Sequence, residues 1–88
     1  MKWKFTDLEF KPFNDSSDTE EARLELTNGY SVIVLKGKMA LHTYGAPYEL
    51  TANPLPNVLM DESIGYLDEK DLMRLINELQ NLPKLNSL

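Results

Sequence analysis

LTNGYSVIVLKG, residues 26–37, places an Asn-Gly pair between two runs of apolar residues. Such a pair is the strongest short-range signal for a β-hairpin, because both residues tolerate the positive φ angles of a two-residue type I′ turn. We therefore predict a hairpin over residues 21–36, with Asn28 and Gly29 at its turn. The pairs expected across it are Leu26–Ser31, Glu25–Val32, Leu24–Ile33, Arg23–Val34 and Ala22–Leu35.

The two strands of this hairpin differ in how their side chains alternate. The first strand alternates apolar and polar residues, which predicts one buried and one solvated face. The second is apolar on both faces, as is typical of a central strand covered on both sides. With the expected pairing, Tyr30, Val32 and Val34 lie on the face that the C-terminal helix does not cover. Either the N-terminal aromatic residues cover this face, or solvent does, or another protein chain binds it.

The C-terminal part of the chain predicts one amphipathic helix. Asp68 is placed to cap its first turn, and Pro83 marks its end. Met73 and Asn77 lie at the margin of the helix, away from its apolar stripe. The residues of that stripe, which recur at helical spacing, are Leu72, Leu75, Ile76, Leu79 and Leu82.

The order of elements predicts an α+β fold, with a small antiparallel sheet of three to four strands and one C-terminal amphipathic helix packed on one face. We expect residues 1–88 to form a single domain. The other segments are expected to be a strand at 2–10, a mobile loop at 11–21, short strands at 39–44 and 48–52, an extended link at 53–60 and a tail at 83–88. Strand pairing within residues 38–60 is left open.

Composition disfavours several classes of function. The chain has no cysteine, which removes disulfides, thiolate catalysis and cysteine-based metal sites. Its net charge of −5 disfavours direct binding of nucleic acid, because phosphates are neutralised by clustered Lys and Arg. No apolar run approaches the roughly 20 residues of a membrane span, and the N-terminus lacks the apolar region of a signal peptide. We therefore expect a cytoplasmic protein that does not contact a membrane.

Few residues suggest catalysis or metal binding. His42 is the single histidine, and it could act as a general base near Tyr44 with Glu49 orienting it. A lone histidine without a motif is more typical of the outward face of a strand. Three carboxylates near the helix start match no known metal-binding loop: Asp61, Glu62 and Asp68. We predict no catalytic residue, no metal and no cofactor, and we do not expect an enzyme.

The hypothesis that remains is binding through the second face of the hairpin. Tyrosine is favoured at binding surfaces because it offers a large contact area at low entropic cost. The candidate interaction residues are Tyr30, Val32, Val34, Tyr44 and Tyr48. The leading interpretation is binding to another protein or self-association into a homo-oligomer. The alternative is that acidic residues of 15–21 and 61–71 mimic phosphates and inhibit a nucleic-acid-binding enzyme.

Four pieces of the sequence, in order, resemble a family of small uncharacterised proteins of bacteriophage and prophage genomes. They are Asn28–Val32, Tyr44-Gly45, Tyr48–Leu50 and Gly65–Leu67, followed by the leucine-rich helix. The resemblance covers about residues 22–82 and departs from the family pattern at ELTANPLPNVLM, residues 49–60. It implies a phage origin, the cytoplasm of a bacterial host and a partner that is a host or phage factor. The family has no established activity, so no functional residue is carried over.

Overall fold

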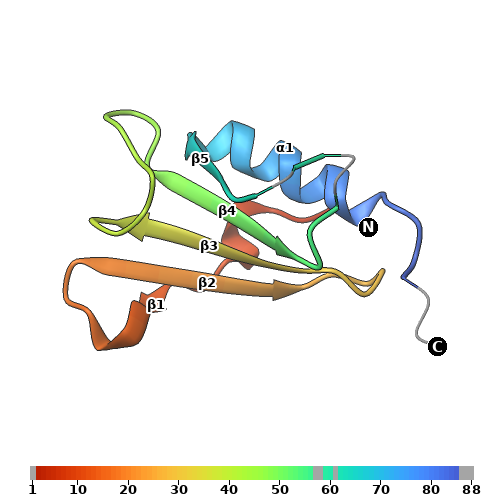
Figure 1. The fold of residues 1–88 in the computed structure, drawn as a ribbon, viewed down its shortest axis with the longest axis horizontal. Helices are drawn as coiled ribbons and strands as arrows, with labels where there is room; N and C mark the ends of the chain where they lie inside the picture. Colours follow the sequence, from red (N-terminus) through yellow and green to blue (C-terminus); the bar gives the residue numbers. More distant parts are fainter. Residues whose placement is uncertain (1, 57–58, 61, 86–88) are drawn as a thin grey trace.

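The computed structural model describes residues 2–56, 59–60 and 62–85. One antiparallel sheet has the strand order β1-β2-β3-β4-β5, and one α-helix lies across one side of it (Figure 1). The predicted α+β class is confirmed, but the sheet has five strands rather than three to four. The elements are η1 (Phe5–Asp7), β1 (Lys11–Pro12), η2 (Phe13–Asp15), β2 (Thr19–Glu25), β3 (Ser31–Gly37), β4 (Tyr48–Asn53), β5 (Ile64–Leu67) and α1 (Glu69–Gln80).

The hairpin of β2 and β3 closes with a three-residue turn, one residue longer than predicted. The Leu26 N–H donates to the Tyr30 carbonyl at 2.8 Å, which leaves residues 27–29 as the loop. Gly29 has a φ of 96°, but Asn28 is not among the described residues with positive φ, as a type I′ turn would require. The predicted pairing is therefore wrong by one residue. The observed pairs are Glu25–Ser31, Leu24–Val32, Arg23–Ile33, Ala22–Val34 and Glu21–Leu35.

This shift exchanges the two faces of β3. Because side chains alternate along a strand, a slip of one residue moves each of them to the opposite face. Val32 and Val34 are fully buried, each opposite a buried residue of β2, and belong to the core on the inner face, which α1 covers. Ile33 and Leu35 are partly exposed on the outer face, which carries neither α1 nor the N-terminal segment.

The outer face has the pattern of a solvated sheet surface. Its two apolar residues are each flanked by polar residues on the neighbouring strands: Ile33 by Arg23 and Thr51, and Leu35 by Glu21 and Glu49. Antiparallel sheets commonly have one packed and one solvated face.

Helix α1 packs on the inner face as the sequence predicts. The carboxylate of Asp68 caps it by accepting a hydrogen bond from the Asp71 N–H at 2.8 Å. The helix ends at Gln80, two residues before the end of the predicted stripe. Leu72, Ile76 and Leu79 are buried, while Leu75 and Leu82 are partly buried at its edges.

The other end of α1 is capped by the turn of the hairpin. The buried side-chain amide of Asn28 lies 2.7 Å from the Leu79 carbonyl, 3.2 Å from that of Gln80 and 3.1 Å from that of Leu82. Carbonyls at a helix C-terminus have no partner within the helix and need one when buried. Asn28 therefore stabilises the helix end as well as forming the turn.

The N-terminal strap, residues 2–10, contains the 3₁₀ turn η1 in place of the predicted strand. Its aromatic rings pack on the inner face beside α1, where Phe5 and Phe10 lie 5.7 and 6.0 Å from the ring centroid of Tyr48. The three alternatives for Tyr30, Val32 and Val34 assumed that these residues lie on the face away from the helix, and this assumption is wrong for the two valines, which α1 and the strap cover together.

Several segments between these elements differ from the predictions. Residues 11–21, expected as a loop, contain β1, η2 and the start of β2. Residues 39–44, expected as a strand, form turns with an isolated bridge from Thr43 to Ala46, while β4 is confirmed. The predicted link at 53–60 and tail at 83–88 lie in part outside the described residues.

Both edge strands of the sheet are short. β1 has 2 residues and contains Pro12, which has no N–H to donate. β5, which the sequence analysis missed, has 4 residues and a bulge, with Gly65 and Tyr66 opposite Glu49. Tyr66 has a φ of 59° there, a conformation that is unusual for a bulky residue.

The observed register is tested by matched substitutions on adjacent residues of β3. Val34→Thr places a hydroxyl in the core and should lower the free energy of unfolding by about 1–3 kcal/mol. Ile33→Thr affects the outer face and should lower it by less than about 1 kcal/mol. Urea denaturation measures both, and a larger loss for Ile33→Thr would contradict the observed register.

The capping role of Asn28 is tested by Asn28→Asp. Asp-Gly is as favourable in a hairpin turn as Asn-Gly. The turn preference alone therefore predicts little change in the free energy of unfolding. The variant nevertheless removes the amide donor and adds a negative charge at a helix C-terminus. We expect a loss of about 2 kcal/mol in the free energy of unfolding. Unchanged stability in thermal or urea denaturation would show that the cap contributes nothing.

Candidate functional site

The residues predicted as an interaction surface do not form one surface. Val32 and Val34 are 0% exposed, Tyr48 is buried, and Tyr30 is partly buried against the core. Burial also raises the pKa of Tyr48 above its ordinary value, and the negative charge of Glu69 adds to this effect. Tyr44 alone is fully exposed, at the tip of the β3–β4 loop. The cause is the longer hairpin turn, which directs the two valines to the inner face.

The candidate catalytic residues His42, Tyr44 and Glu49 form no hydrogen bond with one another within the described residues. His42 is exposed, and its Nδ1 lies 2.7 Å from the Ala40 carbonyl, while Glu49 accepts a hydrogen bond from the Leu41 N–H at 3.0 Å. Within the described residues, no group of three or more His, Cys, Asp or Glu could hold a metal ion. Of the carboxylates considered for a cation, Asp61 lies outside those residues.

The two acidic stretches also lie apart. Residues 15–21 lead into β2 beside the β1 edge of the sheet, whereas the acidic residues around Asp68 follow β5 at the other edge. β3 and β4 separate these edges. The arrangement therefore does not bring the two stretches together into one phosphate-like surface.

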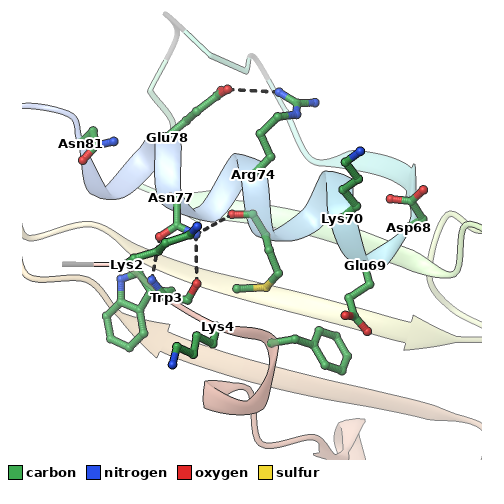
Figure 2. Close-up of a pocket in the computed structure, with 12 residues that line it drawn as sticks. Lys2, Trp3, Lys4, Asp68, Glu69, Lys70, Arg74, Asn77, Glu78 and Asn81 are labelled. Carbon is green, nitrogen blue, oxygen red and sulfur yellow. Dashed lines mark hydrogen bonds and ion pairs between the residues drawn. The ribbon is translucent and has the colours of Figure 1, made fainter.

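A groove lies between the N-terminal strap and α1 (Figure 2). It has a volume of about 1010 Å³ and is open to solvent. Its walls come from segments at opposite ends of the chain. The lining residues are Lys2, Trp3, Lys4 and Phe5 of the strap and Asp68, Glu69, Lys70, Met73, Arg74, Asn77, Glu78 and Asn81 of the helix and its flanks.

Asn77 fastens the strap to the helix and so fixes the groove. Its Oδ1 accepts a hydrogen bond from the Trp3 N–H at 2.7 Å, and its Nδ2 donates to the Trp3 carbonyl at 3.0 Å. The same Nδ2 also donates to the Met73 carbonyl at 2.9 Å. One amide side chain therefore pairs with both backbone groups of Trp3, as a neighbouring strand would (Figure 2).

The indole ring of Trp3 is held by the side chain of Gln80. Its Nε1–H donates to Gln80 Oε1 at 2.8 Å, and the same oxygen accepts the Thr27 N–H at 3.2 Å. These bonds join the strap, the helix and the hairpin turn. The position of the indole is thus determined by three segments of the chain.

The floor of the groove is apolar. Trp3, Phe5 and Met73 are each partly buried against the core and partly open to the groove. Met73 and Asn77 belong to the helix residues that lie off the leucine stripe. Their place at the helix margin was visible in the sequence, but their partner was not, because residues 2–10 were expected to be a strand.

Charged side chains line the rim of the groove, and several of them are already paired. Arg74 forms an ion pair with Glu78 at 3.1 Å, and Asp68 caps the helix. Within the described chain, Lys2, Lys4 and Lys70 form no ion pair. Three lysine charges are therefore available to a ligand.

A second exposed feature lies at the β3–β4 loop, beside β5. Its large apolar residues, here called the turn patch, are Met39, Leu41, Tyr44 and Tyr66. The Tyr66 N–H donates to the Leu41 carbonyl at 2.9 Å. Gly65 has no side chain to collide with Leu41, which lies directly against it. None of these four residues lines the groove, so the turn patch is a separate feature.

Comparison with known proteins adds no relative: no protein-family model, curated protein or solved structure matches this chain. In the part of the chain that the structure describes, no helix has the length and apolar character needed to cross a membrane.

Asn77→Ala should loosen the strap. The loss of hydrogen bonds to the Trp3 backbone should lower the free energy of unfolding by about 1–2 kcal/mol and expose the indole to water. Because Trp3 is the single tryptophan, its fluorescence emission should shift to longer wavelength. Asn81→Ala is the control, since Asn81 also lines the groove but its side chain makes none of these bonds. Unchanged emission in Asn77→Ala would contradict this role.

Proposed function

We propose that this protein is a non-catalytic binding module whose groove receives a segment of another protein. The observation that carries the proposal is the apolar floor of Trp3, Phe5 and Met73, left partly open between the strap and α1. Interaction sites commonly combine an apolar, aromatic centre with a polar rim. This arrangement supports the hypothesis of protein binding, but with different residues from those expected from the sequence.

The shape of the groove favours a peptide over a compact small molecule. Its helix wall follows α1, whose 12 residues span about 18 Å at 1.5 Å per residue. An extended chain of about five residues covers that length at roughly 3.3 Å per residue. Small-molecule pockets usually enclose most of their ligand, whereas this groove is open. The resemblance to prophage proteins points to host or phage proteins as the source of the segment.

The proposal is tested by selecting peptides from a random library on the immobilised protein and titrating them while the emission of Trp3 is recorded. Peptides that occupy the groove should change that emission. They should bind about tenfold more weakly to Met73→Gln, which makes the floor polar with little change in volume, because a buried apolar contact of this size contributes about 1–2 kcal/mol.

Arg23→Gln is the matched control, since Arg23 is exposed on the outer face of the sheet and does not line the groove. Binding to this variant should equal binding to the unaltered protein. Peptides that bind Met73→Gln as tightly as the unaltered protein, or that leave Trp3 emission unchanged, would refute the groove as the binding site.

A further inference from the structure

We infer that the groove selects an acidic, extended segment with an apolar residue at its centre. This inference depends on the proposed function, because it names the kind of segment that the groove accepts. It comes from the distribution of charge around the groove. A protein with a net charge of −5 places four of its nine basic side chains in this lining.

The charges that remain available in the groove are mostly positive. Asp68 accepts the capping hydrogen bond of α1, and Glu78 is paired with Arg74. Of the carboxylates in the lining, only Glu69 has neither an ion pair nor a hydrogen bond within the described chain. It is opposed by three unpaired lysines. A ligand with carboxylates can pair with these lysines, whereas a basic ligand finds only Glu69 without a partner in the lining.

The positions of the lysines determine where the acidic residues belong. Lys2 and Lys4 come from the strap, and Lys70 comes from the facing wall on α1 (Figure 2). The apolar floor of Trp3 and Met73 belongs to the same groove. A segment whose central apolar residue contacts this floor can therefore direct acidic residues to lysines on both walls. Electrostatic complementarity of this kind provides specificity more than it provides affinity.

The inference is tested with three hexapeptides that share a central Leu-Phe pair and differ in their flanking residues, which are all Glu, all Gln or all Lys. Titration is followed by the emission of Trp3 at low salt. We expect the Glu peptide to bind about tenfold more tightly than the Gln peptide, since three exposed ion pairs together have about this effect. The Lys peptide should bind most weakly, and high salt should remove the differences.

The triple variant Lys2→Gln, Lys4→Gln, Lys70→Gln should lose the preference for Glu and retain the affinity for the Gln peptide. Its control is Lys11→Gln, Lys38→Gln, Lys84→Gln, which changes the net charge equally at exposed positions outside the groove. The control should keep the preference. Equal loss in both variants would show a general charge effect and overturn the inference.

The remaining outcomes separate this inference from the proposed function. If the Gln and Glu peptides bind equally and change Trp3 emission, the groove binds peptides but does not select acidic ones. If none of the three peptides changes the emission while peptides selected from the random library do, the inference is overturned and the proposed function stands; if neither set changes it, both proposals fail. An oligo-deoxythymidine probe that binds the groove more tightly than the Glu peptide would assign the lysines to nucleic acid and overturn the inference as well.

Discussion

Three segments of the chain meet at the C-terminal end of α1, and their hydrogen bonds determine most of the structure. The amide of Asn28 binds the last carbonyls of the helix, and Gln80 joins the hairpin turn to Trp3. Asn77, one turn earlier, holds the backbone of the strap. Asn28 does not have the positive φ of a type I′ turn, and the turn has three residues with Gly29 at positive φ. In this turn the Asn28 amide reaches the helix end, so the observed strand register occurs together with the docking of the helix.

Much of the fold could be predicted from the sequence, because its signals are local. The Asn-Gly pair indicated a hairpin, and the leucine stripe with Asp68 indicated a capped helix; both are present. The register was predicted wrongly, since it depends on whether the loop has two or three residues, and a loop that contains Asn-Gly can have either length. One additional residue in the loop places Val34 on the inner face, where the predicted pairing had placed Ile33.

The groove was harder to predict than the fold, because it is formed by segments at opposite ends of the chain. Trp3 and Phe5 alternate as in a strand, but tertiary packing against α1 and Tyr48 outweighs that local preference. Met73 and Asn77 lay off the leucine stripe and carried the only signal in the sequence. The structural role of such residues is recognised when a second segment is shown to contact them. The fold leaves the opposite, outer face of the sheet polar enough to face water.

The short edges of the sheet restrict how another molecule can contact the backbone. β1 offers two residues, one of them a proline, and the bulge in β5 directs the Tyr66 N–H to Leu41. Another chain would find few aligned donors and acceptors at either edge, so adding a sixth strand is unfavourable. If the domain binds a protein segment as proposed, recognition uses side chains rather than main-chain pairing. A partner is consequently distinguished by its own amino-acid sequence, which main-chain pairing alone would hardly sense.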